Sequence, residues 1–423
     1  MNRLSTLGAL IGGAIIVSVL YGIAFGDRNV TTSFDVEEGD GIRHIVNGDR
    51  GDFSLRRDDL IIKASWRGDY TLNEDGDDIA SLEHKLEISR DDGELSERVI
   101  FARDGDKVER TYYRDDEKQD NSDETQAAIG NLLSAFLGAS GIKAEERVAI
   151  LLRKGGVNAV LDEMNGTFGD HARRSYTVAL TEQVDLSPPE IRALLTALDR
   201  VESDHDLRLA LSAILENESV SADEMPAFLA TAAHIESDYD LRRLIETVAD
   251  EPMNDASLAL AIGLLETIES DHDLRRAGEA LLAQDNLSAE NAARLLTAAA
   301  NQLESDHDIR LLLTDSVKFL AQGDIVAKAW LEAFDAISGD HDQRLTLSAA
   351  AEVSELSPSV VTSLIDATTS IESDHDQRLA LETFADRAAD DPVLLTAYKS
   401  AADRVGSDQD RRRALEAIGE ASD

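Results

Sequence analysis

The chain has no cysteine among its 423 residues, and aromatic residues make up only 4% of it. The absence of cysteine excludes disulfides, thiolate metal sites and cysteine nucleophiles. Basic residues are also few, because 41 Lys and Arg stand against 84 Asp and Glu, and the net charge is −43. A field of this sign repels phosphate backbones, so nucleic acid is excluded as a partner. It suits a protein partner with a basic surface.

Sequence motifs of the common enzyme classes are missing. Glu83-His84 is not followed by the residues of a zinc-protease HExxH helix. No GxSxG elbow, P-loop or dinucleotide-binding pattern occurs either. Paired acids are frequent, but a surface this acidic places them together by chance. The sequence therefore predicts a protein that is not an enzyme, with no cofactor and no metal.

One short stretch, Ser-Asp-His-Asp-Leu-Arg, is present whole at Ser203 to Arg208 and returns to the end of the chain. The steps between successive leading aspartates are 34, 34, 33, 35, 34, 34 and 34 residues. A constant period of this length is typical of stacked helical repeats. We therefore expect a mainly α protein, with an α-solenoid of about eight 34-residue helical hairpins (HEAT/TPR-like) over residues 169–423.

Each repeat is predicted to contain two helices. The first begins at the motif, where Ser203 can cap the helix and Asp206 can complete a capping box. Leu207, Leu211 and Ile214 then follow at helical spacing and form one buried stripe. The second helix of a repeat has its own start, as at Ser187-Pro188-Pro189-Glu190.

The leading aspartate of the motif is followed four residues later by an arginine in every copy. Acid first at this spacing is the favourable order on a helix face, but an exposed pair contributes only about 0.3–0.5 kcal/mol. A free energy this small does not explain why the Asp–Arg pair occurs in all eight copies of the motif. We therefore infer that the arginine also reaches the neighbouring repeat and sets the stacking register. The pairs are Asp170 and Arg174, Asp204 and Arg208, Asp238 and Arg242, Asp271 and Arg275, Asp306 and Arg310, Asp340 and Arg344, Asp374 and Arg378, and Asp408 and Arg412.

A histidine between two aspartates recurs at one position of the repeat. Carboxylates beside imidazole could bind a divalent ion, but Tyr239 and Gln409 replace the histidine in two copies, and adjacent helical residues point in different directions. The alternative interpretation is a row that responds to pH or ions, since flanking aspartates favour the protonated ring. The row comprises His205, His272, His307, His341 and His375, with His171 as a partial copy.

Residues 1–26 resemble a signal anchor or a signal peptide. Leu7 to Phe25 is an uncharged apolar run of about the length that crosses a bilayer, and Ala24-Phe25-Gly26 could serve as a cleavage site. We expect residues 4–25 to hold the protein in a membrane, or cleavage near Gly26 to release it. Gly8 and Gly12 form a GxxxG pair that could support weak dimerisation. Both alternatives place the bulk of the chain outside the cytoplasm.

Residues 27–120 alternate apolar and polar side chains and are separated by turn signals such as Asn47-Gly48-Asp49 and Asp104-Gly105-Asp106. This pattern predicts a small antiparallel β domain. We place its boundary in the charged stretch 115–124. Residues 121–168, interrupted by Gly155-Gly156, are predicted to be a helical cap and linker that seals the first repeat.

The repeats resemble units of uncharacterised bacterial exported proteins and of the extracytoplasmic tails of some antirepressor-type membrane metallopeptidases. The segments Arg110-Thr111-Tyr112-Tyr113-Arg114 and Glu145-Glu146-Arg147-Val148 resemble the stretch that precedes the repeats there. The peptidase half is absent from this sequence, so proteolysis is not implied. The resemblance implies a sensing or docking role at the bacterial cell envelope.

These observations predict an extracytoplasmic protein-binding or scaffolding repeat protein. It would have a single-pass inner-membrane anchor and a periplasmic bulk, or be periplasmic after cleavage. The alternative is an envelope hydrolase or metal-dependent enzyme that uses the Asp-His-Asp rows.

Overall fold

The computed structural model describes residues 41–47, 49–166, 169–217, 220–284 and 287–419. The described chain is mainly helical, with 18 α-helices and 59% helix, and it also contains a small antiparallel sheet domain. It divides into two compact units, Met1–Val184 and Asp185–Asp423. The expected membrane segment 4–25 lies outside the described residues. Within the described ranges, no helix is long and apolar enough to cross a membrane.

The first unit contains a seven-stranded antiparallel sheet in the order β1-β2-β3-β6-β7-β8-β9, and a separate β4-β5 hairpin. The strands follow the predicted alternation, and the turn signals of the sequence fall between them. Their bounds are β1 Gly41–Asn47, β2 Arg50–Arg57, β3 Leu60–Arg67, β4 Tyr70–Leu72, β5 Ile79–Leu82, β6 Lys85–Asp91, β7 Ser96–Asp104, β8 Lys107–Arg114 and β9 Glu117–Lys118.

Helix α1 (Asp123–Ser140) covers one face of this sheet. Ile62, Ile88 and Phe101 on the sheet and Leu133 and Phe136 on the helix are all buried in one core. The first unit therefore continues past the boundary expected at 115–124, because α1 supplies the apolar layer that the sheet requires. Its remaining helices are α2 (Ala144–Met164) and α3 (Asp170–Thr181), which pack on each other. Helix α2 is interrupted at the predicted glycines, where Gly156 has a φ of 68°.

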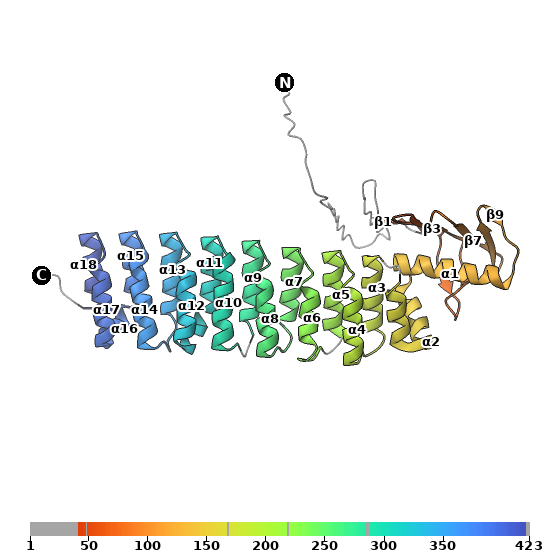
Figure 1. Cartoon of the computed structure of the whole chain (residues 1–423). Coiled ribbons are helices and arrows are strands. Elements are labelled where there is room, and N and C mark those ends of the chain that lie inside the picture. Colours follow the sequence, from red (N-terminus) through yellow and green to blue (C-terminus); the bar gives the residue numbers. More distant parts are fainter. Residues whose placement is uncertain (1–40, 48, 167–168, 218–219, 285–286, 420–423) are drawn as a thin grey trace, which may run out of the picture. The chain divides into compact units, whose positions relative to one another are not determined.

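The second unit is a stack of helical hairpins (Figure 1). Its helices are α4 Pro188–Leu198, α5 Asp204–Asn217, α6 Met225–Ala232, α7 Asp238–Val248, α8 Asp255–Leu265, α9 Asp271–Leu282, α10 Ala289–Gln302, α11 Asp306–Ser316, α12 Asp324–Phe334, α13 Asp340–Ala351, α14 Pro358–Ala367, α15 Asp374–Glu382, α16 Ala385–Asp390, α17 Pro392–Ala402 and α18 Asp408–Ala417. Two 3₁₀ turns, Val317–Gln322 and Thr368–Ser370, complete it.

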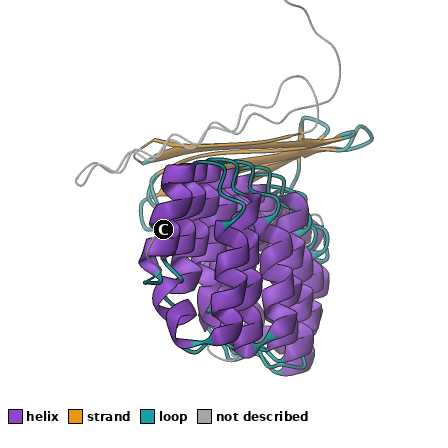
Figure 2. Ribbon diagram, turned by 90° about the vertical axis from the view of Figure 1, so that its left-hand side faces the viewer, coloured by secondary structure: helices purple, strands orange, loops and turns teal. Residues whose placement is uncertain are grey.

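Helices of the same type pack on one another in two rows. The motif helices α5, α7, α9, α11, α13, α15 and α18 form the first row, and α4, α6, α8, α10, α12, α14 and α17 form the second. Each apolar stripe faces the other row, as Leu207 and Leu211 do in α5. The loops gather at the two ends of the helices (Figure 2). The motifs, each at the start of a first-row helix, consequently lie along one edge of the stack, which we call the motif edge.

Candidate functional site: the motif edge and its Arg–Asp contacts

A serine caps most of the first-row helices, as predicted. In α7 the Ser237 hydroxyl accepts the N–H of Asp240 at 3.3 Å. The expected capping box is not formed there, however. The Asp240 carboxylate accepts from Arg208 of the preceding repeat, and the N–H of Ser237 donates to Asp204 of that repeat. Neighbouring repeats therefore supply the partners that a capping box would supply within one helix.

In six of the eight motifs the leading aspartate binds the backbone of the next repeat. Asp306 is the most extensive example, since it accepts from the N–H of Ser338 at 3.0 Å and of Gly339 at 2.9 Å, and from the Ser338 hydroxyl. Burial alone would raise the pKa of Asp306, but these donors outweigh burial and lower it. The same contact joins Asp204 to Ser237, Asp238 to Ser270, Asp271 to Glu304 and Ser305, Asp340 to Glu372 and Ser373, and Asp374 to Gly406.

The motif arginine donates its Nε to the second aspartate of the next repeat, which we call the Arg–Asp ladder. The six contacts are 2.6 to 2.9 Å long: Arg208 to Asp240, Arg242 to Asp273, Arg275 to Asp308, Arg310 to Asp342, Arg344 to Asp376 and Arg378 to Asp410. In the described residues of these six repeats, no ion pair joins the arginine to the aspartate four residues before it. The arginine does reach the neighbouring repeat, and the leading aspartate has a different partner from the one that the spacing indicates.

Three of these arginines also bind a glutamate one turn later in their own helix. They are Arg242 with Glu246, Arg275 with Glu279, and Arg378 with Glu382. Burial alone would lower the pKa of Arg275, but the carboxylates of Asp308 and Glu279 outweigh it and raise the pKa. The corresponding positions in the other three repeats are Ser212, Thr314 and Ser348.

The two ends of the repeat series differ from the middle. In the first unit, Asp170 lies 3.6 Å from Arg173 in its own helix. In the last repeat, Asp408 pairs with Arg411, while Arg412 is exposed and has no hydrogen bond or ion pair within the described residues. Arg412 thus has the sequence of a ladder arginine but no ladder aspartate bound to it in the described residues.

The histidines stand in the first turns of the motif helices, where His272, His307, His341 and His375 are exposed and His171 and His205 are half-buried. Each ring directs its Nδ1 toward an Nη2 of the arginine three residues later: His171 to Arg174 at 2.7 Å, His205 to Arg208 at 3.3 Å, His272 to Arg275 at 3.3 Å, His307 to Arg310 at 3.0 Å, His341 to Arg344 at 3.0 Å and His375 to Arg378 at 3.3 Å. Guanidinium groups only donate, so Nδ1 is the acceptor.

The proposal that this row responds to pH relied on the flanking aspartates. Those of the six ladder repeats bind arginines and backbone N–H groups of neighbouring repeats, and the nearest partner of each ring is a cation. No group of three or more His, Asp or Glu side chains with a metal-binding arrangement occurs in the described ranges.

In five repeats a glutamate stands on the motif edge directly before the capping serine, whereas Ser338 and Gly406 occupy this position in two others. Glu236, Glu269 and Glu304 are exposed, and within the described part of the chain none of them forms an ion pair. The residue before each glutamate, such as Ile235 or Ile268, is buried. This apolar anchor fixes the loop, so the edge presents carboxylates at a regular interval. The sequence carries this signal as an apolar-Glu-Ser-Asp pattern, which the motif-centred interpretation overlooked.

A second inter-repeat contact was also missed by sequence reasoning. At the end of first-row helices a long polar side chain donates to backbone carbonyls of the preceding repeat. Gln322 donates to Leu287 at 3.1 Å, Arg387 to Ala351 at 3.1 Å, and Gln284 to Ala249. The residue type varies between Gln and Arg, so no repeated letter marks the position.

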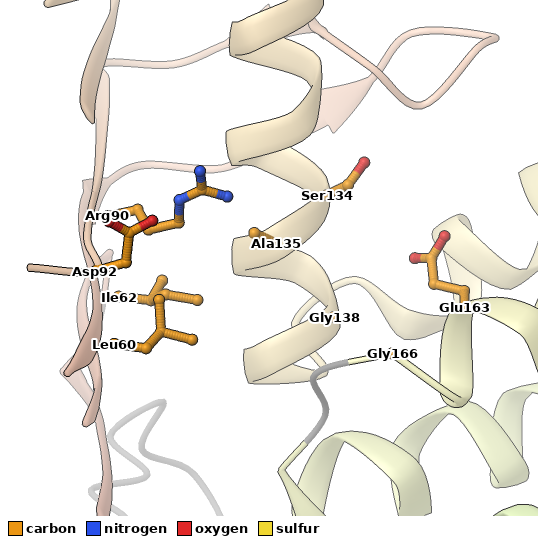
Figure 3. Close-up of a pocket in the computed structure, with 9 residues that line it drawn as sticks. All are labelled: Leu60, Ile62, Arg90, Asp92, Ser134, Ala135, Gly138, Glu163 and Gly166. Atoms are coloured by element: carbon orange, nitrogen blue, oxygen red, sulfur yellow. The ribbon is translucent and has the colours of Figure 1, made fainter. Parts of the chain in front are cut away.

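In the first unit, a pocket of 310 Å³ lies beside α1 (Figure 3). Figure 3 shows Arg90 and Asp92 on the strand side, with Glu163 on the far side of the helix. Arg90 pairs with Glu97 at 2.8 Å, and Glu163 pairs with Arg147 at 2.6 Å. The backbone N–H groups of Leu95 and Glu94 lower the pKa of Asp92. The charged groups around this pocket are therefore engaged in structural contacts.

Arg147, which the sequence singled out before the repeats, joins several parts of the first unit. Its guanidinium donates to the Gly76 carbonyl at 2.6 Å and the Ser134 hydroxyl at 3.1 Å, as well as to Glu163. Tyr176 in α3 adds a hydrogen bond to Glu163 at 3.1 Å. This network fixes α2 against the β4-β5 turn and α1, so we assign Arg147 a structural role.

Comparisons with protein-family models, with curated proteins and with solved structures yield no match for this chain.

Proposed function

We propose that this chain is an extracytoplasmic protein-binding or scaffolding repeat protein of the bacterial cell envelope, built as an α-solenoid of the HEAT/TPR type. The observation that carries the proposal is the motif edge. It carries an exposed glutamate, an exposed histidine or both at the starts of α7, α9, α11, α13 and α15, and inter-repeat contacts hold these positions in place. A long, regular surface of one charge is suited to an extended partner rather than to a small substrate.

The partner is a protein with a basic surface. Glu236, Glu269 and Glu304 are exposed, with no ion pair in the described part of the chain, so they are available to cations. The aspartates beside them are occupied by the ladder and by backbone N–H groups. This difference favours a role for the glutamates in binding the partner and a role for the aspartates in holding neighbouring repeats together. Charge complementarity of this kind acts mainly on specificity and association rate.

The proposed location rests on residues 4–25, whose apolar run would anchor the chain or direct its export. A helical stack displayed outside the cytoplasm fits a docking role. Fractionation of the native organism's cells tests this part, and recovery of the full-length chain in the cytosol would contradict it.

Binding at the motif edge is tested with a defined basic probe, a soluble helical peptide with lysine every fourth residue. We expect the full chain to bind it at low salt and to lose binding when Glu236, Glu269 and Glu304 are all changed to lysine. A matched variant carries the same charge change at Asp250, Glu290 and Glu355, which are exposed near the opposite end of the hairpins. An 11-residue helix such as α7 separates the two ends by about 16 Å. Equal loss in both variants would show that net charge, not the edge, governs binding.

A further inference from the structure

The sheet of the first unit has a second face, which α1 does not cover. Side chains alternate across a sheet, so those opposite the α1 core share this face. Strand pairing aligns Arg43, Ser54, Lys63, Ser89, Arg98 and Tyr113 in one row across six strands. These residues are exposed or half-exposed, in contrast to buried neighbours such as Phe53 and Ala64.

The row is basic in a protein that is otherwise strongly acidic. Arg43 and Lys63 are exposed and, within the described ranges, form no ion pair. Arg98 lies over the ring of Tyr113 at 4.3 Å and pairs with Glu87 at 3.5 Å, so Arg43 and Lys63 are the cations of this row that have no carboxylate partner in the described residues. In a chain with twice as many acids as bases, exposed cations without carboxylate partners mark a surface that suits an anionic ligand.

A shallow groove of 460 Å³ lies on the same face, lined in part by Arg43 and Lys63 and by the hydroxyls of Ser54, Ser65 and Ser89. Cations and hydroxyl donors together can bind carboxylates. The groove also contains Asp52 and Glu87, and Glu87 is paired with Lys85 at 2.7 Å.

The cations of this row occur on every second strand. Arg43 is on β1, Lys63 on β3 and Arg98 on β7, with β2 and β6 between them. Because neighbouring strands lie about 4.8 Å apart, successive cations are separated by about 9.6 Å along the row. Arg43 and Lys63, the two cations without a carboxylate partner, therefore have a spacing that suits an anion series of the same period, and Arg98 with its partner Glu87 continues that spacing.

The motif edge of the second unit is an anion series with that period. Packed helices lie about 8–10 Å apart, so the exposed Glu236, Glu269 and Glu304 of consecutive first-row helices repeat at about this distance. One glutamate of each repeat can thus face one cation of the sheet row. Sheet twist rotates the strands by about 20–25° per step and limits the match to roughly three repeats.

We propose that the basic row of one molecule docks on the motif edge of a second copy of this chain. This inference rests on the proposed function, that the motif edge binds a basic partner, and it names that partner. The two surfaces differ, so the contact is heterologous. Repeated contacts of this kind build oligomers, as rings or as open chains.

The test uses sedimentation velocity of the full-length chain in a mild nonionic detergent, over a range of protein concentrations. We expect a concentration-dependent series of oligomers at about 0.15 M salt and loss of the series at about 1 M, where the screening length falls to about 3 Å. Self-association through Gly8 and Gly12 would persist at high salt, so a salt-resistant dimer alone would overturn the proposal.

Two variants and their mixture make the test specific. Arg43→Glu with Lys63→Glu gives a row variant, and Glu236→Arg, Glu269→Arg and Glu304→Arg gives an edge variant. Each alone should weaken association by about tenfold or more. Mixing them should restore it, because the unchanged row of one variant meets the unchanged edge of the other. Arginine at Asp250, Glu290 and Glu355 should leave association intact.

The outcomes separate this inference from the proposed function. If the wild-type chain binds the basic peptide but does not self-associate, the edge binds another protein and the second-copy assignment is wrong. If it binds neither, both proposals fail. Binding of anionic vesicles that depends on Arg43 and Lys63, without self-association, would assign the basic row to a lipid surface and overturn the proposal.

Discussion

Arg275 donates its Nε to Oδ1 of Asp308 over 2.7 Å, although 33 residues separate the two along the chain. Both side chains are largely buried, at 12% and 14% exposure. A pair removed this far from water differs from an isolated surface pair, because removing one partner leaves the other charge without compensation. The pair also joins consecutive repeats, so its geometry depends on their register.

The first prediction concerns this contact. Arg275→Ala should lower the free energy of unfolding by between about 1 and 3 kcal/mol, since Asp308 loses its cation and Glu279 keeps only the exposed Arg276. Urea denaturation followed by circular dichroism measures the change. Hydrogen exchange should show the loss of protection centred on α9 and α11.

Arg412→Ala is the matched control, because Arg412 occupies the same motif position but is exposed and makes no ladder contact in the described residues. We expect a change within about 0.5 kcal/mol. Equal effects of the two substitutions would mean that the contact between repeats adds nothing beyond the local environment of each arginine.

The second prediction concerns the leading aspartates. Asp306→Ala removes the acceptor for the N–H groups of Ser338 and Gly339, and each lost hydrogen bond costs about 0.5–1.5 kcal/mol. Asp306→Asn keeps one oxygen and should cost less. Asp335→Ala, at an exposed residue of the loop that contains Ser338, is the control and should have little effect. If asparagine and alanine destabilise equally, the carboxylate acts through its charge rather than as a backbone acceptor.

A third prediction follows from the pKa values of the ladder carboxylates. Burial would raise the pKa of Asp308, but the hydrogen bonds from Arg275 and Ser305 outweigh it and lower the pKa. A carboxyl whose pKa is lower in the folded state contributes stability that is complete above the unfolded value of about 3.9 and is lost as pH falls through the folded value. The ladder should therefore weaken below about pH 4.

Acid also protonates carboxylates elsewhere in the chain and so reduces the repulsion caused by the net charge of −43. The pH dependence of wild-type stability alone therefore does not isolate the contribution of the ladder. The measured quantity is the difference in urea midpoint between wild type and Asp308→Asn at several pH values. We expect a large difference at pH 7 that shrinks as the pH falls below 4. A difference independent of pH would contradict the assignment.

Much of this architecture was predictable because the repeat period and the apolar stripes are strong, local signals. The strand alternation around Phe53 and Ile88 and the break at Gly155-Gly156 were predicted for the same reason. The boundary expected in the stretch 115–124 was less predictable. The apolar face of α1 could pack equally well on a sheet or on a helical stack, and the local sequence does not indicate which of these two surfaces it contacts.

The contacts of the motif residues show a similar limit. Spacing alone pairs Asp271 with Arg275 on one helix face, but in the structure Asp271 accepts from the N–H groups of Glu304 and Ser305. The backbone N–H groups at the start of the next helix have no acceptor within that helix, and a pattern read within one repeat does not reveal that Asp271 supplies it. The glutamates of the motif edge were overlooked because their role depends on exposure, which no single repeat reveals.

The last prediction concerns the histidine row. The Nδ1 of His307 accepts from Arg310 at 3.0 Å, so the neutral ring should carry its hydrogen on Nε2. We expect the same tautomer at His272 and His341, which make the same contact. Two-bond proton–nitrogen correlation spectra at neutral pH distinguish the tautomers directly.

Arg310→Met removes the donor while keeping an apolar stem, so only His307 should change to a mixture of tautomers. The ring of His272 serves as the internal control, because Arg275 is unchanged. Protonation of Nδ1 would break the contact and release the guanidinium, so a pH-dependent edge would operate through these arginines rather than through the flanking aspartates. If His307 already shows a mixture of tautomers in the wild-type chain, the rings are independent of the ladder and the row has no such coupling.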